Sequence, residues 1–489
     1  MSDAVFEKPG SWAYTRLGEF LIKGAGSVNP VGFPDEVFEL YSIPAYDKGK
    51  PELSKGREIG STKKVVREGD VLISRIVPHI QRSWVVPKAN GHRQIGSSEW
   101  IIFHGDCYLP AYMKYFLLSP AFHQKYMKTI SGVGGSLTRA NPDQVAEFQF
   151  PLPPLAEQER IVAKIEELFS SLDKGIENLT TAQEQLKVYR QAVLKEAFEG
   201  KVTNKNVKDG ELPEGWLQLY LKDICDLIGG VTKGRNLSGK KTISLPYLRV
   251  ANVQDGYLDL KNIKQIDVLD SDLDKYRLIS GDILYTEGGD RDKLGRGTVW
   301  NGEIKNCIHQ NHIFRARLDK TRYLPKYVAY FSQTKRAKDY FYKNGKQTTN
   351  LASINMTILS NLQIVLPIKI EEQIKVVSEL ENRLSLCDKL EEGIARSLEQ
   401  AEALRQSILK KAFEGRLVPQ DPHDEPASVL LERIRAQRES GDNKAPRTRA
   451  AKPARAEAAP RPAARKRGRS RKADSVETRT TKGKNSHGE

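Results

Sequence analysis

The chain repeats itself at a spacing of 215 residues, and this duplication limits its possible folds more than any other feature. Residues 190–202 read RQAVLKEAFEGKV, and residues 405–417 read RQSILKKAFEGRL. LPAYMKYF at 109–116 likewise matches LPKYVAYF at 324–331, and GDVLIS at 69–74 matches GDILYT at 281–286. The spacing drifts slightly between matches, as insertions in loops would cause. The chain is therefore a tandem duplication followed by a tail, and each copy should form a similar unit.

Each copy is predicted to end in one long helix. Apolar residues recur every seven positions, and further apolar positions between them complete a two-position heptad seam. The second module follows the first helix after a short linker, so the second helix is expected to run back along the first, antiparallel. The residues of this predicted seam are Ile161, Ile165, Leu168, Leu172, Leu179, Ala182, Leu186, Tyr189 and Val193, and Val376, Leu380, Cys387, Leu390, Ile394, Ala401, Leu404 and Ile408.

The rest of each copy is predicted to be a mixed α/β module. Short β-branched or alternating runs at 70–74, 84–86, 101–103, 282–286 and 313–317 are expected to be strands. Residues 112–118 and 327–331 are expected to be helical. The resulting division is a module at 1–152, a central helix at 153–200, a second module at 201–366, a distal helix at 367–418, an extension with a short helix at 419–439, and a basic tail at 440–489 whose composition predicts disorder.

The net charge of +16 is distributed unevenly along the chain. Residues 1–150 carry +3, 201–366 carry +9 and 440–489 carry +10, whereas 151–200 and 367–439 carry −3 each. This division predicts nucleic acid as the partner of the modules and protein as the partner of the helices. The four cysteines form no CxxC pair, which argues against a disulfide framework or a four-cysteine zinc site. The sequence contains no apolar run of membrane-spanning length, so we expect a cytoplasmic protein without membrane association.

Catalytic signatures are largely missing from the sequence. It contains no G-x-x-x-x-G-K-[ST] phosphate loop, no Asn/Asp-Pro-Pro-aromatic motif of an amino-methyltransferase, and no nuclease Pro-Asp followed by acid-x-Lys. One group, Cys307, His309 and His312, has spacing compatible with metal ligands. The matching positions of the first copy, Ile95, Ser97 and Trp100, cannot coordinate a metal. We therefore expect a buried strand there, with neither catalytic, cofactor-binding nor metal-binding residues in the chain.

Basic and amide side chains gather in loops that differ between the two copies, although the segments around these loops match. Arginine can bind guanine O6 and N7, glutamine can bind adenine N6 and N7, and glycine-rich loops allow the backbone to approach a phosphate. Similar modules with dissimilar basic loops suit two readers of different sequences. The predicted DNA-binding residues are Arg75, His79, Gln81, Arg82 and Arg139 in the first copy, and Lys233, Arg235, Arg291, Lys293, Arg296, Lys346, Gln347 and Asn350 in the second.

Three features together resemble the DNA-specificity subunits of type I restriction–modification enzymes: LPPLAEQERIV at 152–162, the AFEG helix ends within the tandem repeat, and DPHDEPASVLLERIRAQR at 421–438. The resemblance covers about 12–438. It implies two target-recognition domains that each read half of a bipartite DNA site, spaced by two antiparallel coiled-coil helices. It also implies two docked methyltransferase subunits and recruited motor-nuclease subunits, with S-adenosylmethionine, ATP and Mg²⁺ belonging to those partners. The family transfers no fixed base-reading residues.

Two alternatives remain open at this stage. One is a self-sufficient restriction or modification enzyme with a diverged active site. The other is an RNA-binding repeat scaffold, although the aromatic-rich strand signatures of RNA-binding modules are lacking. The basic tail departs from the family pattern. Its two interpretations are added sequence-independent DNA affinity through counterion release, and a solubilising extension.

Overall fold

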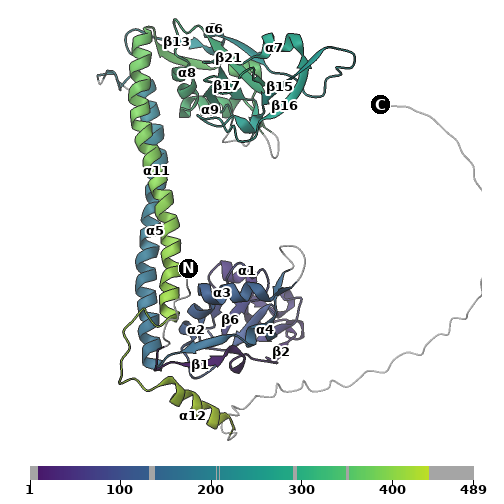
Figure 1. Ribbon diagram of the computed structural model, residues 1–489, viewed down its shortest axis with the longest axis vertical. Helices are drawn as coiled ribbons and strands as arrows, with labels where there is room; N and C mark the ends of the chain where they lie inside the picture. The colour runs from purple at the N-terminus through teal and green to yellow at the C-terminus, as the bar shows by residue number, and fades with distance from the viewer. Residues whose placement is uncertain are drawn as a thin grey trace, which may run out of the picture. The chain divides into compact units, whose positions relative to one another are not determined.

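The computed structural model describes residues 9–131, 138–204, 206–208, 210–289, 294–347 and 352–439. By packing, the chain divides into Met1–Glu432 and Arg433–Glu489. The first unit contains two α/β modules and a pair of long helices (Figure 1). Helix α12 (Ala427–Glu439) begins in the first unit and ends in the second. Across these described ranges, none of the helices combines the length and apolarity needed to cross a membrane.

The two long helices are α5 (Leu155–Phe198) and α11 (Ile370–Phe413), each of 44 residues. At 1.5 Å per residue each is about 66 Å long. They lie side by side along their length (Figure 1). Arg190 pairs with Asp388 at 2.6 Å, and Arg405 makes the matching pair with Asp173. From Asp173 to Arg190 along α5, the partner residues run backwards along α11, from Arg405 to Asp388. The helices are therefore antiparallel, as predicted.

The predicted seam is buried only in part. Ile165, Leu186 and Val193 are buried on α5, as are Leu380, Cys387 and Ile408 on α11. The prediction is wrong for three members, because Tyr189, Leu390 and Leu404 are 47%, 49% and 51% exposed. Within the part of the chain that the structure describes, the middle of each long helix packs against the other long helix alone (Figure 1). At 3.6 residues per turn, a seven-residue repeat drifts about 20° round the helix axis in each heptad, so part of the seam turns away from the partner helix and these three side chains lie in solvent.

The first module is mixed α/β, as predicted. Its sheets have the orders β2-β5-β8-β3-β4, β7-β6-β9, β1-β12 and β10-β11. Its strands are β1 (Ala13–Arg16), β2 (Ser27–Val28), β3 (Val37–Tyr41), β4 (Glu52–Lys55), β5 (Lys63–Val65), β6 (Val71–Ser74), β7 (Ser83–Val85), β8 (Arg93–Gly96), β9 (Trp100–Phe103), β10 (Ile130–Ser131), β11 (Arg139–Ala140) and β12 (Gln149–Leu152); its α-helices are α1 (Ile43–Asp47), α2 (Pro110–Leu117), α3 (Pro120–Tyr126) and α4 (Pro142–Ala146).

The second module repeats this plan with different additions. Its sheets have the orders β14-β21-β17-β19, β16-β15-β20, β18-β23-β22 and β13-β24. Its strands are β13 (Trp216–Tyr220), β14 (Cys225–Gly229), β15 (Thr242–Leu248), β16 (Lys264–Leu269), β17 (Ile283–Thr286), β18 (Gly288–Gly289), β19 (Gly297–Val299), β20 (Ile308–His309), β21 (Ile313–Leu318), β22 (Lys346–Gln347), β23 (Ala352–Ser353) and β24 (Gln363–Pro367); its α-helices are α6 (Leu221–Ile224), α7 (Asp270–Tyr276), α8 (Pro325–Ser332), α9 (Lys335–Asn344) and α10 (Met356–Ser360).

Each module is held by the beginning of one long helix. Buried Gln158, in the first turn of α5, accepts from the backbone N–H of Leu109 at 2.9 Å and donates to two backbone carbonyls. Gln373 of α11 makes the same set of bonds in the second module, accepting from the N–H of Leu324 at 2.8 Å. These matching glutamines therefore fix each helix start to the module that precedes it.

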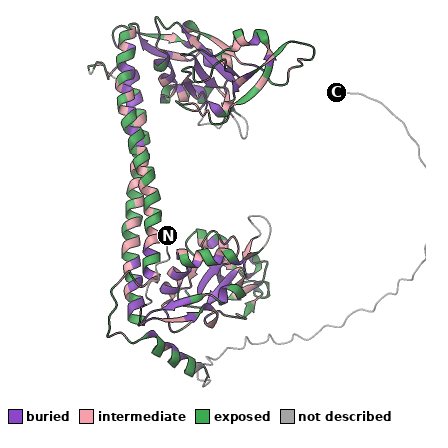
Figure 2. Ribbon diagram, in the orientation of Figure 1, coloured by how far each residue is buried: buried purple, intermediate pink, exposed green. Residues whose placement is uncertain are grey.

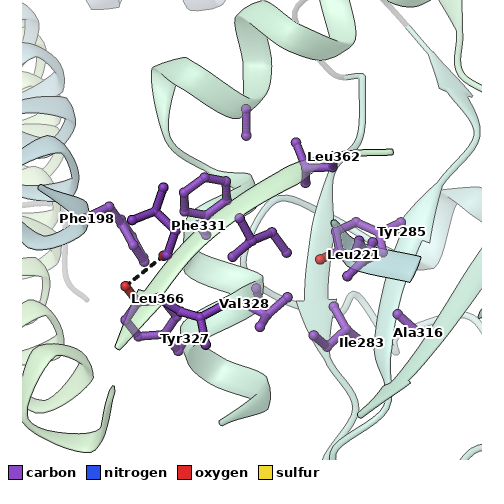
Figure 3. Packing of buried hydrophobic residues seen from close by; sticks show 14 of the residues in the cluster. Phe198, Leu221, Ile283, Tyr285, Ala316, Tyr327, Val328, Phe331, Leu362 and Leu366 are labelled. Atoms are coloured by element: carbon purple, nitrogen blue, oxygen red, sulfur yellow. Dashed lines mark hydrogen bonds between the residues drawn. The ribbon is translucent and has the colours of Figure 1, made fainter. Parts of the chain in front are cut away.

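Each module is also held by the end of the other long helix. Phe198 at the end of α5 packs on Tyr327 and Phe331 of α8, with ring centroids 4.9 and 5.3 Å apart (Figure 3). Phe413 at the end of α11 packs in the same way on Tyr112 and Phe116 of α2, at 5.2 and 5.4 Å. The long helix that follows each module therefore ends against the other module, which is an exchange of helix ends between the two copies. Purple, buried residues accordingly mark the modules and both ends of the helix pair (Figure 2).

The C-terminal extension returns to the first module. The N–H of Ala427 donates to the carbonyl of Ser11 at 3.1 Å. Asp424 accepts from Arg160 of α5 at 2.6 Å, and little of its carboxylate is exposed. The segment before α12 therefore lies against both the start of the first module and the start of α5.

Candidate nucleic-acid interface

The loop between β6 and β7 carries four of the residues predicted to read DNA. Its stem closes through the N–H of Ser74, which donates to the carbonyl of Arg82 at 3.0 Å. On one side Ile76 bridges to Arg139, and the N–H of Val77 donates to the carbonyl of Thr138 at 3.2 Å. The structure therefore joins this loop to β11, which carries the fifth predicted residue of the first module.

Two of the predicted arginines share one carboxylate. Arg139 donates through Nε and Nη2 to Glu99 at 3.0 to 3.1 Å. Arg75 Nε lies 3.8 Å from the same carboxylate, and both guanidinium groups are about one-third exposed. The hydrogen bonds that Arg139 donates to Glu99 raise the pKa of Arg139. This cluster holds two cations on one anion, so its net charge is +1.

Arg82 is paired more completely. Its Nε and Nη2 donate to the two carboxylate oxygens of Asp47 at 2.9 and 3.2 Å, and only 11% of its side chain is exposed. The hydrogen bonds from Arg82 lower the pKa of Asp47. The Nε–Nη2 edge of this guanidinium, one of the two edges that can clamp a guanine, is therefore occupied by the carboxylate of Asp47 at the end of α1.

The tip of the loop is a strained turn. Val77 has a φ of +49°, which a β-branched residue rarely adopts, and the N–H of Ile80 donates to its carbonyl at 3.0 Å. His79 and Ile80 are exposed. Gln81 is half-buried, and its amide nitrogen has no hydrogen-bond partner. Such strain persists only where the surroundings impose it, and it clusters at ligand-binding segments.

The described candidates of the second module lie on three separate segments. Arg235, in the loop after β14, donates to Asp272 at the start of α7, while Lys233 in the same loop is exposed. Burial alone would raise the pKa of Asp272, but the bonds from Arg235 and from the N–H of Leu269 outweigh it and lower the pKa. Arg235 is therefore an anchored residue, as Arg82 is.

Two other candidates of the second module lie on a strand that pairs with β23. Lys346 and Gln347 form the exposed strand β22, which pairs with β23; β23 in turn pairs with β18. Arg296 donates to Gln254 at 2.7 Å. β18 leads directly into residues 290–293. The predicted residues Arg291, Lys293 and Asn350 lie outside the described residues.

The three possible metal ligands, Cys307, His309 and His312, each have a different environment in the structure. His309 is buried, and its Nδ1 lies 2.9 Å from the carbonyl of Ile313. Burial lowers the pKa of His309 to about 4. Cys307 is buried in an apolar cluster, whereas His312 pairs with Glu287. Within the described ranges, no three His, Cys, Asp or Glu side chains are grouped as metal ligands would be.

Sequence reasoning missed the partners of these arginines. Glu99 lies 40 residues from Arg139 in the sequence. Asp47 lies 35 residues from Arg82, and Asp272 lies 37 residues from Arg235. Periodicity and local motifs do not report pairs so far apart. A comparison of the two copies is the sequence signal that could have identified these carboxylates. Residues that bind to loops which differ between the copies should themselves differ between the copies.

Comparison with known proteins decides the family. The model of the type I restriction modification DNA specificity domain matches residues 61–184 and 213–400, together more than half of the chain. The chain belongs to this family. The specificity subunit is 29% identical over 361 residues to the type I restriction enzyme EcoKI specificity subunit of Escherichia coli K12, covering 71% of this chain and 75% of that relative. It is 28% identical over 354 residues to the StySPI specificity subunit of Salmonella potsdam, with 70% and 74% covered.

Solved structures show the same fold. One comes from work described as the structural basis of complex assembly and conformational transition of the type I R-M system; its TM-score is 0.68 at 24% identity, with 84% of this chain and all of that chain covered. The HsdS subunit of Thermoanaerobacter tengcongensis has a TM-score of 0.53 at 22% identity, with 85% and all covered. The expectation of a recognition subunit instead of an enzyme is confirmed by this family membership.

Proposed function

We propose that this specificity subunit reads an asymmetric, bipartite site in double-stranded DNA, one half-site per module. The observation that carries the proposal is the contrast between the shared structure and the loops. β6, β7 and β9 match β17, β19 and β21, and the long helices hold both modules through the same contacts. The loops that these strands present differ in length, charge and anchoring.

We also infer that the subunit serves as a scaffold for two methyltransferase subunits and for motor-nuclease subunits. A structure with this fold comes from work on type I complex assembly, and the acidic helices suit protein better than DNA. S-adenosylmethionine, ATP and Mg²⁺ would bind to those partners. Such a complex works on cellular DNA, which places it in the cytoplasm.

Mapping methylated bases in a host genome that encodes the subunit, with and without its gene, tests the proposal. The expected result is one motif with two dissimilar half-sites, methylated only when the gene is present. A palindromic motif, or methylation independent of the gene, would contradict it. Turnover by the purified chain alone with DNA and S-adenosylmethionine or Mg²⁺ would instead support a self-sufficient enzyme.

A further inference from the structure

The three arginines of the first module that were predicted to read bases are all held by carboxylates. Arg82 is bonded by Asp47 along one edge, and Arg139 and Arg75 lie on Glu99. An arginine that clamps a guanine must offer two parallel N–H groups from one edge. In Arg82 and Arg139 the Nε–Nη2 edge already donates to a carboxylate, so a base could use this edge only by breaking two charge-assisted bonds, and only 11% of the Arg82 side chain is exposed.

Contacts on both sides fix the geometry of the turn. Backbone contacts of Arg75, Ile76 and Val77 hold the first side of the loop against β11 and the residue before it, and the ion pair of Arg82 with Asp47 holds the second side against α1. The positive φ of Val77 shows that this enclosure imposes a conformation which the isolated segment would avoid. The turn presents the imidazole of His79 and the sec-butyl side chain of Ile80 to solvent, whereas Gln81 is half-buried and its amide nitrogen is buried without a hydrogen-bond partner.

We propose that His79, Ile80 and Gln81 form the base-reading turn of the first module, that this turn reads an A·T pair, and that Arg75, Arg82 and Arg139 position it. The inference rests on the proposed function. An amide matches N6 and N7 of adenine, and an exposed aliphatic side chain matches the thymine methyl group. Ile80 is 43% exposed. The amide nitrogen of Gln81 is buried without a partner, so it gives up no hydrogen bond when the side chain turns outward to a base.

The test selects binding sites from a random duplex library with the full-length chain and its methyltransferase partner present throughout. For the wild type we expect two dissimilar half-sites. Gln81→Ala should reduce the preference at one A·T position by about tenfold, and Ile80→Ala should weaken the preference at the same or the adjacent pair. The other half-site and the midpoint of thermal unfolding should not change.

Asp47→Asn separates positioning from contact. The variant keeps every cation of the loop and removes one anchor. If Arg82 positions the turn, preference falls in the first module's half-site alone, and Asp47→Glu restores it. If Arg82 contacts DNA, its release leaves the preference intact and tightens binding, which overturns the inference. Asp35→Asn is the matched control, because Asp35 is an exposed partner of Arg57 in the same module and its loss changes the charge equally.

The two levels of failure are distinguishable. A wild-type chain that enriches no defined sequence contradicts the proposed function. A wild-type chain with clear half-sites, whose A·T positions survive both Gln81→Ala and Ile80→Ala, contradicts only the inference about the turn.

Discussion

Gly200 and Gly415 end the two long helices in the left-handed conformation, with φ of +75° and +71°. A Cβ at Gly200 would lie 2.3 Å from Cγ of Pro213, and one at Gly415 would lie 2.4 Å from Cγ of Pro9. Alanine at either position should therefore cost about 1–2 kcal/mol for the backbone alone, plus the clash. We expect similar losses at the two positions in denaturant unfolding of the full chain, because their surroundings match.

Two other glycines provide the control. Gly175 and Gly393 lie inside α5 and α11, and a Cβ at either would meet nothing within 4 Å. Alanine there should stabilise the chain by up to about 1 kcal/mol through its greater helix propensity. A Gly200→Ala variant as stable as Gly175→Ala would show that the helix end does not pack as described.

Glu157 gives a pH-dependent prediction. Burial raises its pKa above the ordinary 4.5, although Trp12 Nε1 donates to it at 3.0 Å. A carboxyl with a raised folded pKa costs nothing below the unfolded value and destabilises the fold as pH rises past it. Glu157→Gln keeps an acceptor for Trp12 and removes the buried charge. The variant should unfold at a higher temperature than the wild type at pH 7, and the gain should vanish near pH 4.

The matching residue of the second copy is the control for this prediction. Glu372 accepts from Trp216 Nε1 at 2.9 Å but is only partly buried. Glu372→Gln should give a smaller gain at pH 7. An equal gain at both positions would mean that burial is not the cause.

At the scale of elements, the sequence predicted what depends on period and repetition. The strands at 70–74 and 313–317 appear as β6 and β21, and the two long helices appear within two to five residues of their predicted limits. β3 was missed because its partner β8 is remote in the sequence. β15 was missed because an irregular loop separates it from its partner β16. The site residues were found as residue types, but their ion pairs were not, because those pairs exist only in the folded chain.

The helix pair predicts a spacer that can be changed. One heptad inserted after Leu179, with another after Ile394, keeps the apolar seam in phase and lengthens the pair by about 10 Å. The ion pairs Arg190–Asp388 and Arg405–Asp173 lie on either side of the insertions and should survive. DNA rises about 3.4 Å per base pair, so methylation mapping should show a spacer longer by about one to three base pairs with unchanged half-sites.

The outcome of this insertion distinguishes the helices from the modules. An active variant with the original spacer would mean that the helices do not set the distance between half-sites. Altered half-site bases would mean that the reading residues are not confined to the modules. Inserting a heptad in α5 alone is the control, because it places the two ion pairs out of register and should destabilise the chain.

At the scale of the whole molecule, the internal repeat predicts stoichiometry. The two copies present matching helix ends and matching contacts, such as Tyr115 to Glu166 and Tyr330 to Glu381 at 3.5 and 3.4 Å. Two similar surfaces should dock two methyltransferase subunits per chain. Native mass measurement at saturating partner concentration tests this, and a single bound copy would contradict it.

The exchange of helix ends has a consequence for synthesis on the ribosome. The first module receives Phe413 on Tyr112 and Phe116, so its packing waits for a side chain made almost 300 residues later. At the usual pace of translation that interval lasts roughly 15–60 s. During it, an aromatic surface of the nascent chain remains open to chaperones and to neighbouring chains. Premature termination anywhere before the end of α11 releases a product whose first module lacks the contact with Phe413. This holds even though every residue of that module has already been synthesised.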